Sequence, residues 1–140
     1  MTHIKRLSFF SGMLLIGLWG CSQEDAQPTP NPSIVGSWLF VEYGYSPGAG
    51  YIVKKAPLIP PQAVSFTAQG EVATVNMGKS ALAQARTYRI DSTRYGTYLI
   101  ILDSTQRQIG YSLFVSIRND TLRLSPPCIE GCHSGYVRIR

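Results

Sequence analysis

The stretch I-G-Y-S-L-F-V-S-I-R-N-D-T-L-R-L, from Ile109 to Leu124, decides the fold class of this 140-residue chain. Apolar side chains occupy every odd position as far as Ile117, and this period of two is typical of a half-buried strand. The turn Arg118-Asn119-Asp120-Thr121 follows, in which Asn and Asp tolerate the positive φ of a tight hairpin. The alternation resumes after the turn, so the stretch predicts a β-hairpin.

The same pattern continues through the rest of the chain after Ile34. Val64 and Phe66 lead through the turn Thr67–Gly70 into a second hairpin, and Tyr98–Leu102 is apolar on both faces. No segment of helical length shows an apolar period of 3.6 residues. We therefore expect eight strands, near Val35–Tyr43, Ala63–Thr67, Glu71–Asn76, Gln84–Ile90, Thr97–Asp103, Ile109–Ile117, Thr121–Ser125 and Gly135–Arg140.

Eight short strands joined by short turns would leave exposed sheet edges, and closing the sheet on itself removes those edges. The sequence thus predicts an all-β fold, an eight-stranded antiparallel up-and-down barrel. The interior of a barrel of this size is filled with side chains or holds one small ligand.

The first expected strand begins with Gly36-Ser37-Trp38, which resembles the G-x-W signature of lipocalins and of the lipocalin-like, calycin-type domains of bacterial lipoproteins. The resemblance implies that Trp38 closes the narrow end of the barrel and that an arginine near the C-terminus stacks on it. Arg138 and Arg140 are the candidates, because a guanidinium over an indole is a favourable cation–π contact. The alternative is that Trp38 is an ordinary core aromatic.

The first twenty residues are typical of an export signal. Two basic residues precede the apolar run Leu7–Trp19, whose 13 residues are too few to span a bilayer. The run ends in Leu18-Trp19-Gly20-Cys21, which resembles the lipobox of lipoproteins from Gram-negative bacteria. The resemblance implies that Cys21 is acylated and anchors the protein in the outer membrane, with the lipid bilayer as its partner. The alternative is an ordinary signal peptide in which Cys21 is incidental.

The segment Ser22–Ser33 has no large apolar residue and places prolines at positions 28, 30 and 32, which is typical of an extended tether. Its acidic Gln23-Glu24-Asp25 resembles export signals for the outer face of the outer membrane, or it is simply a solvated acidic patch. We therefore expect a signal peptide at 1–20, a lipidated tether at 21–33 and one lipocalin-like domain at 34–140.

One connection, Gly44–Pro61, is unusually long and carries three glycines and four prolines. Loops of this length are often lids or binding loops. The lipocalin resemblance implies that this loop folds over the open end of the barrel, with two lysines at the rim that suit an acidic head group or partner. The alternative is that its apolar side chains only cover the barrel mouth. The candidate ligand-binding residues are Tyr45, Tyr51, Ile52, Lys54, Lys55 and Leu58.

Cys128 and Cys132 are predicted to form a disulfide, because the chain carries an export signal and the two cysteines are close in sequence. Cys132-His133 ends like a haem-attachment motif, but three residues separate the cysteines where that motif has two. Zinc would need a fourth ligand, which the usual spacing does not supply. We therefore predict no cofactor and no metal.

The charge pattern and the absence of catalytic motifs narrow the function classes. The formal net charge is +5, but the basic residues are scattered, which argues against a nucleic-acid partner. We expect no enzyme, because no nucleophile motif accompanies His133, the one histidine after position 20. Two hypotheses remain: a lipoprotein that binds a small apolar ligand in the barrel mouth, or a solid-cored interaction or inhibitor module that contacts an envelope protein.

Overall fold

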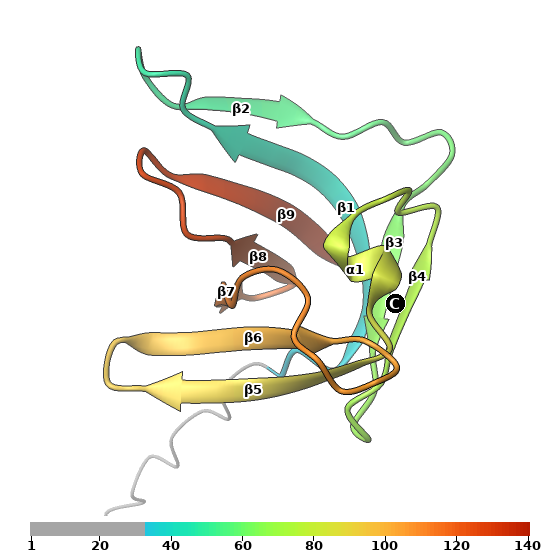
Figure 1. Cartoon of the computed structure of the whole chain (residues 1–140). Coiled ribbons are helices and arrows are strands. Elements are labelled where there is room, and N and C mark those ends of the chain that lie inside the picture. The colour runs from blue at the N-terminus through green and yellow to red at the C-terminus, as the bar shows by residue number, and fades with distance from the viewer. Residues whose placement is uncertain (1–32) are drawn as a thin grey trace, which may run out of the picture.

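The computed structural model in Figure 1 describes residues 33–140, so the expected signal peptide, Cys21 and nearly all of the tether lie outside the described residues. No helix within 33–140 is long and apolar enough to cross a membrane. The described chain forms β1 (Gly36–Tyr45), β2 (Ile52–Lys55), β3 (Ala63–Phe66), β4 (Val72–Val75), α1 (Ala81–Gln84), β5 (Thr87–Thr93), β6 (Gly96–Leu102), β7 (Leu113–Arg118), β8 (Thr121–Ser125) and β9 (Cys132–Ile139).

The strands form one antiparallel sheet in the order β4-β3-β1-β9-β8-β7-β6-β5, with β2 paired to the far half of β1. Apart from β2, strands that follow one another in the chain are neighbours in the sheet, with the exception of β4 and β5. The sheet curls until the first strand, β1, lies beside the last, β9 (Figure 1). The expected all-β antiparallel meander is therefore confirmed.

The closed barrel predicted from the sequence is wrong, because the sheet stays open between β4 and β5. Within 33–140 these strands meet at one bridge, Glu71 with Thr87, where the Val72 N–H donates to the Arg86 carbonyl at 2.9 Å. Both strands begin next to this bridge and run in opposite directions, so they diverge at once. The short helix α1 lies in the connection between them, and its Leu82 is buried.

The predicted hairpins are present, with local differences at their ends. Asn119 has φ of 52° in the turn between β7 and β8, as the Asn-Asp pair predicts. The predicted strand 109–117 begins only at Leu113, because Gly110 has φ of 64° and breaks the extended path. As a result β6 and β7 pair over two positions, Tyr98 with Phe114 and Leu99 with Leu113.

The core lies on the concave face of the sheet. Its largest side chains are almost fully buried, and within 33–140 no buried side-chain nitrogen or oxygen lacks a hydrogen-bond partner. Burial of each such side chain contributes about 1.5–3 kcal/mol. Because this core is complete within the described residues, we expect residues 33–140 to fold on their own. The core side chains are Trp38, Val64, Phe66, Leu99, Ile101, Leu122, Leu124 and Tyr136.

Trp38 and Arg138 hold the segment that leads into β1. The Arg138 guanidinium lies 4.1 Å from the centre of the Trp38 ring, and it would collide with a side chain at Gly36. The Trp38 Nε1–H donates to the Ile34 carbonyl at 2.7 Å. Arg140 does not stack on Trp38 and instead forms an ion pair with Asp120.

Candidate functional site

A cavity of about 540 Å³ opens between the concave face of β5–β7 and the three residues Ser33–Val35, which we call the strap. Most of its lining residues are aliphatic or aromatic, the others are serines and a threonine, and none is charged. We call it the strap cavity. The aliphatic and aromatic residues are Ile34, Val35, Tyr88, Ile90, Val115 and Ile117, and the serines and threonine are Ser33, Ser92, Thr97 and Ser116.

The strap cavity exists because the β5–β6 hairpin separates from β7. β6 and β7 pair at only two positions, so the first residues of β6 and the last residues of β7 stay apart. On one wall, the Tyr88 ring packs edge-on against Phe66 with centroids 5.1 Å apart, and its hydroxyl donates to the Thr67 carbonyl at 2.7 Å. Burial raises the pKa of Tyr88, so this phenol stays a neutral donor.

The strap is held in place at both of its ends. The two terminal nitrogens of Arg138 donate to the carbonyls of Val35 at 2.9 Å and Ser33 at 3.0 Å. Ile34 is buried, with 7% of its surface exposed, and belongs to the hydrophobic core. The strap is therefore a fixed wall of the strap cavity.

A second, smaller cavity of about 240 Å³ lies at the other end of the curled sheet, next to α1. The packed core separates it from the strap cavity. Tyr136 contributes to its wall, and burial raises the pKa of this phenol to about 12. The interior is thus filled in the middle and hollow at both ends.

The segment Gly44–Pro61 does not form the expected lid over a barrel mouth. It contains the end of β1, a hairpin loop and β2, and all four residues of β2 are exposed. None of the six candidate residues lines the strap cavity or the cavity next to α1. The reason is that β2 pairs with the part of β1 that runs past the curled sheet. Tyr45, Tyr51, Ile52, Lys54, Lys55 and Leu58 lie on or beside this projecting ribbon.

We call this projecting ribbon the extension: β2 together with residues 42–45 of β1 and 132–135 of β9. In Figure 1, β2 lies beside the far end of β1. The register between β1 and β9 shifts between Phe40 and Glu42, and such a bulge turns the following side chains to the opposite face. Phe40, Tyr43 and Tyr45 consequently stack in a row, with centroids 6.4 and 6.2 Å apart, whereas Glu42 lies on the other face.

The extension carries a hydrogen-bonded network that the sequence did not reveal. His133 is buried, its Nε2 lies 3.2 Å from Glu42 Oε1, and its Nδ1 contacts the Tyr51 hydroxyl. Arg123 donates to the same carboxylate at 3.1 Å. Because the carboxylate of Glu42 can only accept, Nε2 of His133 carries the proton it donates, and Nδ1 can then accept a hydrogen bond from the Tyr51 hydroxyl. Glu42 is 91 residues and Tyr51 is 82 residues away from His133 in the sequence, so no local motif indicates this network.

Two glycines make room for this network. A Cβ at position 44 would collide with the Tyr51 hydroxyl and the His133 ring, and a Cβ at position 135 would lie 2.5 Å from Cγ of Glu42. The tyrosine, histidine and carboxylate are connected in the same order as the nucleophile, the base and the orienting acid of a catalytic triad. The Tyr51 hydroxyl, however, is directed to the sheet surface above Gly44. We interpret the network as a clamp that joins β2 to β9 across β1.

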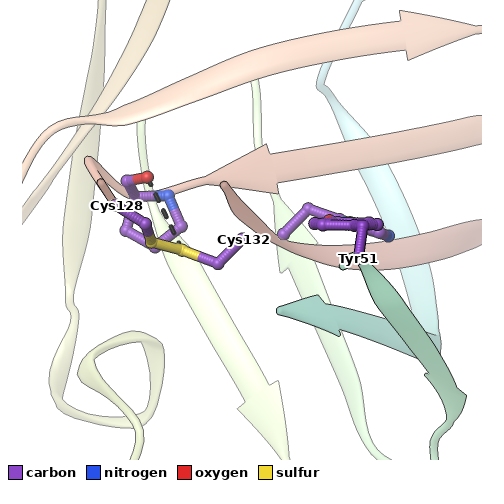
Figure 2. Close-up of a disulfide and its surroundings, with 5 residues drawn as sticks. Tyr51, Cys128 and Cys132 are labelled. Atoms are coloured by element: carbon purple, nitrogen blue, oxygen red, sulfur yellow. Dashed lines mark hydrogen bonds between the residues drawn. A yellow bond between two sulfur atoms is a disulfide. The ribbon is translucent and has the colours of Figure 1, made fainter. Parts of the chain in front are cut away.

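The predicted Cys128–Cys132 disulfide is confirmed, with its Cα atoms 5.9 Å apart. It closes the loop that precedes β9, and Figure 2 shows it next to Tyr51. The Tyr51 ring also packs over Gly131, where a Cβ would lie 3.5 Å from the ring edge. Since both thiols are consumed in the disulfide, neither can ligate haem or zinc.

Lys54 extends over the aromatic row on the same face. Its ammonium lies 5.7 Å from the centre of the Tyr45 ring, and a hydrogen bond with the Tyr45 side chain raises the pKa of Lys54. This lysine therefore remains positively charged on the exposed surface of the extension.

The structure thus holds two separate candidate sites: an uncharged cavity under the strap and a rigid polar and aromatic extension. No family model, no curated protein and no solved structure matches this chain.

Proposed function

We propose that this chain is a lipocalin-like lipoprotein that binds a small, uncharged and mainly apolar ligand in the strap cavity. The observation that carries the proposal is a cavity of about 540 Å³ walled by aliphatic, aromatic and hydroxyl-bearing side chains. Ligand pockets typically measure about 300–1,000 Å³ and combine apolar walls with a few polar groups.

The chemistry of the walls restricts the ligand. A charged group would lose its hydration without gaining a counter-ion, because no lysine, arginine or carboxylate lines the cavity. Hydroxyl groups at Ser92 and Thr97 can exchange hydrogen bonds with one or two polar atoms. A neutral molecule with an apolar body and a hydroxyl or carbonyl group fits these walls.

The lipobox-like Leu18–Cys21 supports placing this site at a membrane. In this proposal an acylated Cys21 anchors the protein in the outer membrane, and the proline-rich tether leads to Ser33. Ser33 itself lines the cavity, so the ligand site lies where the tether joins the domain. The bilayer is then both the anchor and a nearby source of apolar ligand.

The neutral fluorescent probe N-phenyl-1-naphthylamine tests the cavity in a fragment of residues 33–140. We expect saturable binding that Val115→Trp weakens at least about tenfold, because the indole fills the cavity. Val137→Trp on the outer face is the matched control and should leave the affinity unchanged. Equal binding by all three proteins, or no saturable binding by the parent, would contradict the proposal. Circular dichroism checks that each fragment is folded.

A further inference from the structure

The extension is rigid although it has no hydrophobic core of its own. The disulfide fixes the start of β9, and the Glu42–His133–Tyr51 network joins β9 to β2. Gly44 and Gly135 lie opposite His133 and Glu42, where any side chain would disrupt the network. Preorganising a surface in this way lowers the entropic cost of binding to it.

One edge of the extension has unpaired backbone groups. β2 pairs only with β1 among the described strands. The Ala56 N–H donates to the Val41 carbonyl at 2.8 Å, which fixes the alternation of hydrogen bonds along this antiparallel pair. By that alternation Ile52 and Lys54 direct their backbone groups toward β1. Val53 and Lys55 direct theirs away from it, toward the free edge.

The side chains along this edge divide into an aliphatic half and a basic half. Ile52 and Val53 are 40% and 51% exposed. Lys54 and Lys55 are exposed as well, and neither forms an ion pair with a carboxylate within 33–140. Glu42 is the carboxylate opposite Lys55 in the register, but it is already bonded to His133 and Arg123.

The lysines decide which strand fits this edge. A second copy of β2 would bring four lysines into one two-stranded ribbon, and like charges on neighbouring strands are destabilising. A strand with acidic residues would instead place each carboxylate beside an unpaired ammonium. Opposite charges across strands are favourable.

We propose that the free edge of β2 binds an extended acidic segment of a partner protein, which adds to the sheet as a further antiparallel strand. The segment has two consecutive acidic residues opposite Lys55 and Lys54, followed by two aliphatic residues opposite Val53 and Ile52. The backbone of this segment forms hydrogen bonds with the outward-facing N–H and C=O groups of Val53 and Lys55. This proposal does not depend on the strap cavity.

The probe is the capped peptide acetyl-Thr-Glu-Glu-Val-Val-Thr-amide, added to the chain from Cys21 to Arg140 with Cys21→Ser. We expect saturable amide shifts in its NMR spectrum that are confined to residues 51–56 and their neighbours on β1. A peptide with two lysines in place of the glutamates should bind at least about tenfold more weakly.

Two variants separate the backbone and charge contributions. Val53→Pro removes an outward N–H that β1 does not use, so the ribbon should persist while peptide binding is lost. Val53→Thr keeps the N–H and should retain binding. Lys54→Glu with Lys55→Glu should reverse the preference between the two peptides. Lys79→Glu with Arg89→Glu makes the same charge change elsewhere and should not reverse it. If Val53→Pro does not fold, the two double charge variants still test the proposal.

Several outcomes would overturn the proposal. Shifts along the β5 edge in place of β2, or equal binding of both peptides, would show that β2 does not select an acidic strand. A concentration-dependent dimer lost in Val53→Pro would identify a second copy as the occupant. If the acidic peptide binds to residues 33–140 but not to the longer chain, Glu24 and Asp25 of the same chain would be identified as the occupant of the edge. Val115→Trp should leave peptide binding unchanged, which separates this test from that of the strap cavity.

Discussion

The two halves of β1 are stabilised by different physical means although they belong to one continuous strand. Residues 36–40 lie between β3 and β9, and there Trp38 is completely buried. Residues 42–45 lie between β2 and β9, where side chains on both faces are reached by solvent and a disulfide and a polar network hold the strands together. β9 pairs with both halves, with one bulge between Phe40 and Glu42, so the main difference between the halves lies in the side chains.

This sheet therefore separates global stability from local rigidity. Burial of apolar surface in the first half stabilises the whole domain, because the side chains involved come from nearly every strand. The second half contacts few other elements, so its contacts stabilise mainly the extension. The bulge after Phe40 marks the boundary between the two.

The largest effect is expected from Trp38→Ala, which should lower the free energy of unfolding by about 3–5 kcal/mol. The substitution removes a buried indole together with its bond to Ile34 and its contact with Arg138. Urea unfolding followed by circular dichroism measures the change, and Trp38→Phe should recover part of it. A loss below about 1 kcal/mol would mean that the first half of β1 is not the stabilising half.

Removal of the disulfide by Cys128→Ser with Cys132→Ser should cost about 2 kcal/mol, because the closed loop is short. Amide hydrogen exchange distinguishes where this loss acts. We expect faster exchange at the start of β9 and in β2, with little change in β6. Uniformly faster exchange would show that the extension and the core unfold together.

Tyr51→Phe removes the hydroxyl that contacts His133 and should cost about 1 kcal/mol. The effect should again be confined to the extension and appear as faster exchange of the β2 amides. Tyr95→Phe, at an exposed hairpin tip, is the matched control and should not alter β2. If Tyr51→Phe and Tyr95→Phe behave alike, the clamp does not join β2 to β9.

The smallest effect is expected at Asp103, which lies in the connection after β6, away from the extension. A hydrogen bond from Thr105, helped by the Arg107 backbone, lowers the pKa of Asp103 to about 2 from its usual 3.8. A carboxylate with a lowered pKa stabilises the fold above its unfolded pKa, and this contribution is lost as the pH falls through about 2. Asp103→Asn should remove this acid-dependent step in thermal melts between pH 4 and pH 2 without changing β2 exchange. An unchanged step would place its origin in another carboxylate.

Local chemistry accounts for what could be predicted about the fold. The period of two in β7 and β8 and the Asn119 turn identified a hairpin, because alternation and turn conformation depend on neighbouring residues. The predicted β9 began at Gly135, three residues late, and this left His133 in a loop. β2 was missed for a similar reason, since a glycine- and proline-rich context concealed four residues that extend only by pairing with β1.

The candidate sites were harder to predict than the strands. Strand alternation places Tyr88 and Ile90 on one face of β5, but only the separation of β6 from β7 turns that face into a cavity wall. Of the six residues assigned to a lid, Tyr45, Ile52, Lys54 and Lys55 lie on the extension, because the length of β1 carries them past the curled sheet. Tyr51 lies just before β2 and Leu58 in the connection after it. The binding roles of all six stay a prediction.

By itself, the sequence determined that this chain forms an antiparallel meander and that two neighbouring cysteines close a loop, because these features follow from interactions between residues close in the chain. The tertiary structure alone decided that the sheet stays open between β4 and β5, that the strap covers a cavity, and that Glu42 meets His133. These features depend on strand register, stagger and a single bulge. A shift of one residue in any of them exchanges the two faces of a strand, and nothing in the local pattern specifies it.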